Sequence, residues 1–245
     1  MLLRVTAECS RDAVTGQGEL ENVTHSQRFW PLKASGTSSA APFVHALGAR
    51  RLSTQSAVAV KAGAVLFMTV LTALAAQVSV SIPFTAVPFT MQPMVVLMAG
   101  LALGPRLGMT SQLLYLAAGI AGWPVFAASV TLPPGAARLL GPTGGYLMAY
   151  PVAAFVTGWL ATRGFDRRYL TSVAAMLAGL AVIYVCGVTW LGLFARAVDQ
   201  TPAIGLQAAL AAGLYPFAPA DLVKVLAAAG IMPGLWRLFG GHRAE

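Results

Sequence analysis

Six long apolar runs follow one another along the chain, and short polar or proline-containing breaks separate them. The runs cover residues 62–82, 92–103, 107–121, 144–161, 170–195 and 219–237. A helix needs roughly 20 apolar residues to cross about 30 Å of hydrocarbon. The second and third runs are shorter than this, so we expect some of their ends to lie in protein-lined regions. The pattern predicts an all-α membrane protein with six transmembrane helices.

The basic residues predict the orientation of these helices. Six crossings place Arg50, Arg51, Lys61, Arg106, Arg163, Arg167, Arg168, Arg237 and Arg243 on one side, and Arg138 and Arg196 on the other. Because cytoplasmic loops carry the excess of Lys and Arg, both termini are predicted on the cytoplasmic side. Residues 203–214 are also apolar, but a seventh crossing there would move Arg237 and Arg243 outward. We therefore expect a short interfacial helix at 203–214.

Composition agrees with a multi-pass membrane protein and excludes several function classes. Of the 245 residues, 57% are hydrophobic and 10% are charged, whereas soluble domains average about 25% charged residues. The net charge is +8. The basic residues are spread between the apolar runs, where they indicate topology, so we expect no nucleic-acid partner. The three histidines lie outside the apolar runs and there are two cysteines, so we expect no metal, no cofactor and no catalytic site. An intramembrane transferase would need clustered acids, histidines or a Ser/Lys dyad within the spans.

The N-terminal segment differs in composition from the rest of the chain. Residues 1–56 are polar, and residues 22–55 lack acids while holding basic residues and serines. This composition resembles an organellar transit peptide. The alternatives are a poorly ordered tail or a start codon placed too far upstream. We therefore divide the chain into an N-terminal extension, residues 1–56, and a six-helix transmembrane domain, residues 57–240.

Two ionisable residues at the start of the last apolar run are the main candidates for a binding site. Asp221 follows the sequence Pro-Phe-Ala-Pro, and Lys224 comes three residues later. On a helix, these positions share one face. Charged side chains within a membrane segment cost about 2.5–3.5 kcal/mol each and usually mark a substrate or ion site. The alternative is an ion pair that only supports packing, although buried pairs rarely stabilise more than apolar residues.

Further polar and aromatic residues are candidates for the same site. On the predicted outer side or within the spans lie Thr90, Gln92, Tyr115, Arg138, Thr143, Gly145, Tyr146 and Tyr184. Gln92 can bind a ligand amide or cap the backbone, and Arg138 can bind a carboxylate or be solvated. The Gly-Pro-Thr-Gly-Gly-Tyr motif at 141–146 allows close backbone approach to a ligand or tight packing between helices. Both interpretations of each residue remain open.

Several of these motifs together resemble the BioY family, the biotin-binding S components of energy-coupling factor (ECF) transporters. The similar segments are residues 87–92 (VPFTMQ), 103–108 (LGPRLG), 114–126 (LYLAAGIAGWPVF), 141–147 (GPTGGYL) and 216–224 (PFAPADLVK). They extend over about residues 60–238 in the family's order. The resemblance implies a six-helix membrane protein with an outward-facing biotin pocket. It also implies that the loops after the first and third helices close over the vitamin, and that Asp221 and Lys224 contact it.

Biotin suits these residues chemically. A carboxylate such as Asp221 can accept hydrogen bonds from the ureido N–H groups, and Lys224 can donate to the ureido carbonyl. Arg138, Thr143 or Tyr146 could meet the valerate carboxylate. The first helix departs from the family, because instead of Ala-x-x-x-Ala for docking it offers residues 59–63 (Ala to Gly) and 72–76 (Thr to Ala).

The expected function is therefore high-affinity biotin binding and uptake. The chain would act as the substrate-capture component of an ECF-type transporter, with a coupling transmembrane protein and ATPase subunits, or as a solitary transporter. The alternatives are a membrane structural or assembly protein, or an S component for another vitamin. We expect an integral protein of a bacterial-type cell membrane, or of an organelle membrane if residues 1–56 are a transit peptide.

Overall fold

The computed structural model describes residues 42–43, 54–80, 87–128, 132–194 and 205–240. Most of these residues are helical. The longer helices are α2 (Thr54–Gln77), α3 (Gln92–Leu103), α4 (Pro105–Ile120), α6 (Gly144–Ala161), α7 (Tyr169–Leu193), α9 (Ala218–Ala228) and α10 (Ile231–Gly240). The shorter elements are β1 (Ser79–Val80), β2 (Phe89–Thr90), α5 (Ala137–Leu140) and α8 (Leu206–Gly213). Apart from residues 42–43 and 54–56, the predicted extension lies outside the described residues.

The helices lie where the apolar runs predict them, with two corrections to their ends. Helix α2 begins at Thr54 and ends at Gln77, not at residues 62 and 82, because the chain then forms strand β1, which pairs antiparallel with β2. The last run is divided into α9 and α10 by a turn at 229–230. The stretch at 203–214 does contain a short helix, α8.

Within the residues that the structure describes, three helical segments are long and apolar enough to cross a membrane. They are α2, α7 and the combined α9–α10 segment, Ala218–Leu238. Helix α3 is apolar but shorter. One residue, Gly104, separates α3 from α4, and its φ of 83° is a left-handed conformation that suits glycine. The fold is therefore mostly helical, with three clear candidate spans.

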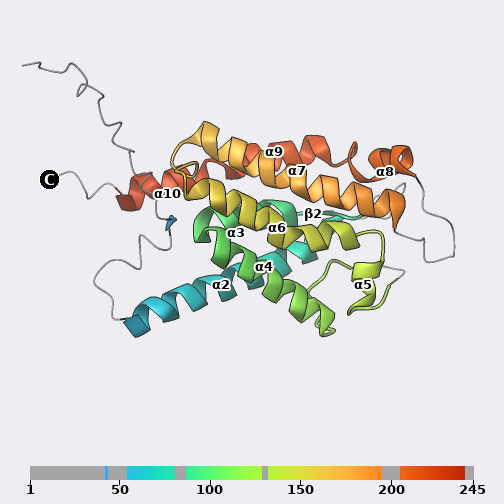
Figure 1. Cartoon of the computed structure of the whole chain (residues 1–245), viewed down its shortest axis with the longest axis horizontal. Helices are drawn as coiled ribbons and strands as arrows, with labels where there is room; N and C mark the ends of the chain where they lie inside the picture. The colour runs from blue at the N-terminus through green and yellow to red at the C-terminus, as the bar shows by residue number, and fades with distance from the viewer. Residues whose placement is uncertain (1–41, 44–53, 81–86, 129–131, 195–204, 241–245) are drawn as a thin grey trace, which may run out of the picture. The chain divides into compact units, whose positions relative to one another are not determined.

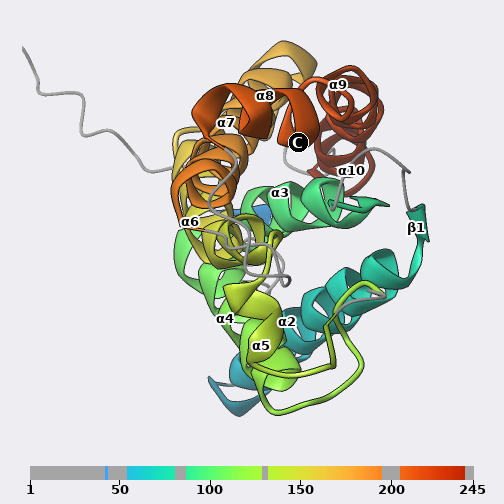
Figure 2. The ribbon, with the colours of Figure 1, turned by 90° about the vertical axis from the view of Figure 1, so that its right-hand side faces the viewer.

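Helix α6 packs against α3, α4 and α7 (Figures 1 and 2). Small residues allow this close approach. A Cβ atom added to Gly100 of α3 would overlap Ala154 and Thr157 of α6, and one on Gly158 of α6 would overlap Gly104 and Pro105. In membranes, small residues let helix backbones approach closely. The packing fixes the positions of α3 and α7, which carry side chains of the candidate site.

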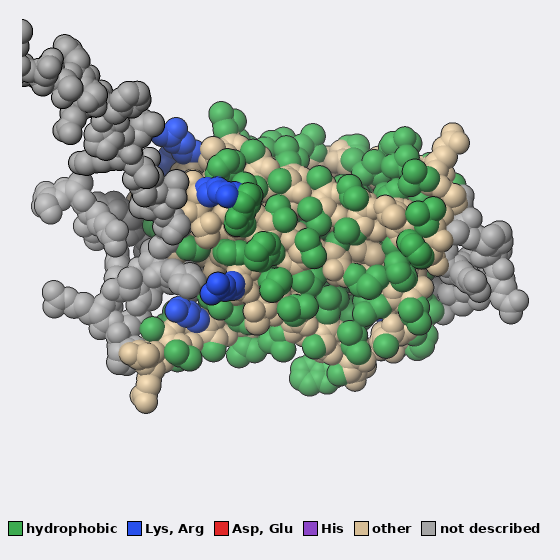
Figure 3. Space-filling model, in the orientation of Figure 1, with side chains coloured by type: hydrophobic (Ala, Val, Ile, Leu, Met, Phe, Trp, Pro, Cys, Tyr) green, Lys and Arg blue, Asp and Glu red, His purple; other side chains and the backbone are tan. Residues whose placement is uncertain are grey.

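Basic side chains gather at one end of the body, on the face that Figure 3 shows. This is the end at which α6 is connected to α7 and α10 lies. In that connection Arg163 lies over the Trp159 ring, 3.1 Å from its centroid. Asp166 is buried there, its Oδ2 accepts a hydrogen bond from Trp236 Nε1 of α10 at 2.6 Å, and burial raises its pKa. Helices α5 and α8 lie at the opposite end (Figure 1).

Replacing Gly100 with Ala should lower the free energy of unfolding by about 1–3 kcal/mol, because the added methyl group would overlap α6. The matched change Gly63→Ala on α2 should be neutral or slightly stabilising, since no described atom lies within 4 Å of its added Cβ. Thermal unfolding of both variants in detergent measures the difference. Equal melting temperatures would contradict a close α3–α6 contact.

Candidate ligand-binding site

Asp221 and Lys224 form a buried ion pair on α9. Asp221 lies in the first turn of the helix and Lys224 one turn later, so their side chains share a face as the spacing predicts. Lys224 Nζ lies 2.8 Å from Asp221 Oδ1. Asp221 is 6% exposed and Lys224 is 9% exposed. The lysine therefore compensates the negative charge that the carboxylate brings into an apolar body.

Partners from two other elements complete this pair. The Tyr184 hydroxyl of α7 donates to Asp221 Oδ2 at 2.6 Å. Lys224 Nζ donates to the Thr90 carbonyl of β2 at 2.6 Å and lies 3.6 Å from the centroid of the Phe89 ring. An ammonium over an aromatic face is attracted by the ring quadrupole. The ion pair thereby joins α7, α9 and strand β2.

The ion pair keeps capacity for further hydrogen bonds. An ammonium carries three N–H donors, and a carboxylate offers about four acceptor sites. Lys224 uses donors on Thr90 and Asp221, and Asp221 accepts from Lys224 and Tyr184. One donor and some lone pairs are thus left over. This combination suits a neutral polar ring that has both N–H and C=O groups.

A second hydrogen-bonded cluster begins at Gln92, two residues after Thr90. Gln92 Nε2 donates to the Tyr115 hydroxyl at 2.6 Å, and that hydroxyl donates to the Val125 carbonyl at 3.3 Å. Gln92 is 3% exposed and Tyr115 is fully buried. The Phe126 ring packs edge-on against Tyr115, with 5.4 Å between centroids. Gln92 and Tyr115 therefore form one buried polar unit between α3, α4 and the loop after α4.

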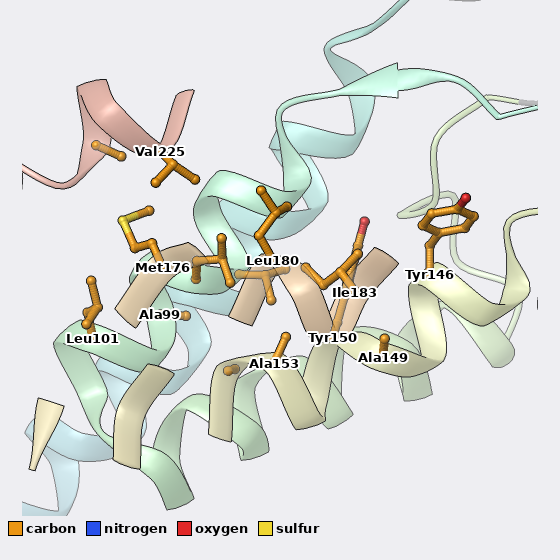
Figure 4. Close-up of a cluster of buried hydrophobic side chains, with 14 of the residues drawn as sticks. Ala99, Leu101, Tyr146, Ala149, Tyr150, Ala153, Met176, Leu180, Ile183 and Val225 are labelled. Atoms are coloured by element: carbon orange, nitrogen blue, oxygen red, sulfur yellow. The ribbon is translucent and has the colours of Figure 1, made fainter. Parts of the chain in front are cut away.

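Tyr150 of α6 lies between these two clusters, and the sequence analysis missed it. It interacts electrostatically with both Tyr115 and Asp221, and its ring centroid is 6.5 Å from that of Tyr115. Figure 4 shows Tyr146 and Tyr150 on α6 with their hydroxyl oxygens turned to the same side of the helix. The sequence could have indicated Tyr150, because it follows Tyr146 by four residues and so shares the same face of the helix.

Arg138 lies on α5, between α4 and α6, and is 9% exposed, so the alternative of a solvated loop arginine is wrong. Its Nε donates to the Pro133 carbonyl at 3.2 Å, and Nη1 donates to the Ala127 carbonyl at 2.7 Å. Burial lowers the pKa of the guanidinium, which also interacts electrostatically with Tyr115. The remaining N–H groups of the guanidinium are suited to an anionic ligand group.

The motif at 141–146 has a packing role in this structure. A Cβ atom on Gly145 would overlap Trp190 of α7, and Trp190 Nε1 donates to the Gly141 carbonyl at 2.9 Å. The Tyr146 hydroxyl donates to the Gly213 carbonyl of α8 at 3.0 Å. Thr143 precedes α6 and makes no capping hydrogen bond with its side chain. These contacts support the packing interpretation of Gly145 and leave ligand contact by Thr143 and Tyr146 as a prediction.

The structure thus brings the predicted residues together in two groups. Asp221, Lys224, Tyr184 and the Thr90 backbone form one, and Gln92 with Tyr115 forms the other. Within the described ranges, no three His, Cys, Asp or Glu side chains come together as metal ligands would. Chemically, the first group offers acceptors and a donor on α9, and Arg138 offers a buried cation.

Comparison with known proteins identifies similar chains. The sequence profile of the BioY family matches residues 49–241. A probable biotin transporter BioY from Pyrococcus horikoshii is 44% identical over 158 residues, which cover 64% of this chain and 85% of that protein. The biotin transporter BioY of Thermotoga maritima is 35% identical over 159 residues, covering 65% and 86%. The crystal structure of an S-component for biotin from an ECF-type ABC transporter has a TM-score of 0.65 and 26% identity, covering 76% of this chain and 95% of that one.

Replacing Asp221 with Leu should lower the free energy of unfolding by about 3–5 kcal/mol, because Lys224 would remain as a buried charge without its counter-ion. The double variant Asp221→Leu/Lys224→Met should regain most of this loss, since it removes both charges. Thermal unfolding in detergent, with the wild type alongside, measures the effect. A double variant no more stable than the single one would show that the charges are not coupled.

Proposed function

Because this chain belongs to the BioY family, we propose that it binds biotin with high affinity and takes part in its uptake across a membrane. The observation that carries the proposal is the buried ion pair of Asp221 and Lys224, which has hydrogen-bonding capacity left for a ligand. A purely structural or assembly role, the alternative, would make this costly pair difficult to explain. The family match also does not favour that alternative.

The proposed binding mode follows from the chemistry of the vitamin. The ureido ring of biotin offers two N–H donors and one carbonyl acceptor. Asp221 accepts from the N–H groups, and Lys224 supplies a donor. The valerate carboxylate lies toward Arg138, whose guanidinium is held by two loop carbonyls. The aromatic rings of Phe89 and Phe217, which stack with 6.4 Å between centroids, cover the apolar part of the ligand.

The chain acts in transport as a binding subunit and catalyses no reaction. It captures biotin, and ATP-driven movement depends on a coupling transmembrane protein and ATPase subunits. The similar S-component comes from a transporter of that type. Uptake by cells that express the chain with and without such partners distinguishes this arrangement from a solitary transporter.

The proposed topology has six crossings with both termini on the cytoplasmic side. The basic end of the body, with Arg163, Arg167 and Arg168, faces the cytoplasm or its organellar equivalent. The end with α5, α8 and the β1–β2 pair then faces outward, so the vitamin enters there. The short helices α3 and α4 join the longer spans in crossing the membrane.

The first prediction from this proposal concerns biotin affinity. Asp221→Asn should weaken biotin binding about 10- to 150-fold, because it removes a charge-assisted acceptor. Equilibrium binding of labelled biotin to the detergent-solubilised chain measures the change. Asp166→Asn is the matched control at the basic end, where an amide oxygen can still accept from Trp236, and it should bind like the wild type. Equal affinities of the wild type and both variants would show that Asp221 does not bind biotin.

A second prediction concerns the orientation in the membrane. In a background without Cys9 and Cys186, Leu140→Cys should react with a membrane-impermeant maleimide in intact cells, because Leu140 is 72% exposed at the proposed outer end. Arg163→Cys, at the basic end, should react only after the membrane is permeabilised. The opposite labelling pattern would reverse the proposed orientation.

A further inference from the structure

We propose that the hydroxyl group of Tyr150 contacts the ligand directly and donates a hydrogen bond to the ureido oxygen of biotin. The inference rests on the proposed function and adds a residue that the sequence motifs do not include.

Four buried or half-buried tyrosines lie on the helices around the site, and three of them have bonded hydroxyls. Tyr115 donates to Val125, Tyr146 donates to Gly213 and Tyr184 donates to Asp221. Among the described residues, no hydrogen-bond partner is found for the Tyr150 hydroxyl, although the residue is 4% exposed. A buried tyrosine hydroxyl usually has a partner, so Tyr150 differs from its three neighbours.

The oxygen of Tyr150 is also not sealed inside the protein. In the described part of the chain, two side-chain polar atoms are fully buried and have no hydrogen-bond partner, Gln112 Oε1 and Asp166 Oδ1. The Tyr150 oxygen is not one of them, so part of its surface remains exposed. The proposed ligand contact uses this exposed part of the oxygen.

The surroundings of Tyr150 decide which role the hydroxyl takes. It interacts electrostatically with Asp221 and Tyr115, and Tyr184 interacts with it in turn. Lys224 and Tyr184 already donate to the two carboxylate oxygens of Asp221. Among the described residues, no hydrogen bond joins the Tyr150 hydroxyl to Asp221 or to another acceptor, so its proton is left for a ligand. A Phe ring would fill the packing position equally well, so packing alone gives no reason for the oxygen.

The acceptor on biotin follows by chemistry. Biotin carries three groups of acceptors: the ureido oxygen, the thioether sulfur and the valerate carboxylate. The sulfur is a weak acceptor, and the carboxylate is directed toward Arg138 in the proposed binding mode. The ureido ring is the group that Asp221 and Lys224 hold. Tyr150, which interacts electrostatically with Asp221 and whose ring centroid lies 6.5 Å from that of Tyr115, then meets the ureido oxygen.

Binding of biotin and of dethiobiotin to the full chain tests the inference. Dethiobiotin keeps the ureido ring and the carboxylate but lacks the sulfur. Tyr150→Phe should weaken the binding of both ligands by the same factor, about three- to tenfold, which corresponds to one neutral hydrogen bond. Tyr215→Phe is the matched control, because Tyr215 is 63% exposed outside the site, and it should bind both ligands like the wild type.

Each outcome has a separate meaning for the two proposals. Unchanged affinity of Tyr150→Phe for both ligands, with normal thermal unfolding, would overturn the role of Tyr150. A loss of affinity for biotin alone would also overturn it, because the hydroxyl would then meet the sulfur. A wild-type chain that does not bind biotin would instead overturn the proposed function. The change removes a single oxygen atom that has no described partner, so the thermal stability of the ligand-free variant should equal that of the wild type or exceed it.

Discussion

The structure depends on the compensation of two buried charges in a body made largely of apolar helices. A carboxylate or an ammonium in such surroundings is costly unless its charge is paired and its hydrogen bonds are made. Asp221 and Lys224 meet this requirement with each other, with Tyr184 and with the Thr90 carbonyl. These bonds connect α9 to α7 and to β2. The need to pair and hydrogen-bond two buried charges therefore positions three separate parts of the chain.

Close packing by small residues supplies the framework for this polar centre. The contacts of Gly100 with α6, and of Gly145 with Trp190 of α7, bring α3, α6 and α7 together. As a result Gln92, Tyr115 and Tyr150 come from three helices to one region. Packing and the proposed ligand site are thus linked, because glycines with no functional group of their own set the spacing of the helices that carry the polar side chains.

The two ends of the helical body differ in chemistry. One end carries exposed arginines and the buried contact of Asp166 with Trp236. The other end carries α5 with the buried Arg138, α8 and the strands beside the ion pair. In the proposed topology this difference sets the orientation of the protein in the membrane. The basic end faces the cytoplasm, and the ion pair of Asp221 and Lys224 is reached from outside.

The sequence by itself determined the helical segments, the short helix at α8 and the shared face of Asp221 and Lys224. Each of these depends on local periodicity or spacing, which can be seen within one short segment of the sequence. Only the tertiary structure decided that Tyr184 and Thr90 complete the ion pair, that Arg138 is buried, and that Tyr150 is buried with no described hydrogen-bond partner. The bonds of Asp221 to Tyr184 and of Lys224 to Thr90 join residues 37 and 134 positions apart. Such contacts are set by helix packing and strand pairing across the whole body, and hydrophobic periodicity within one segment carries no information about them.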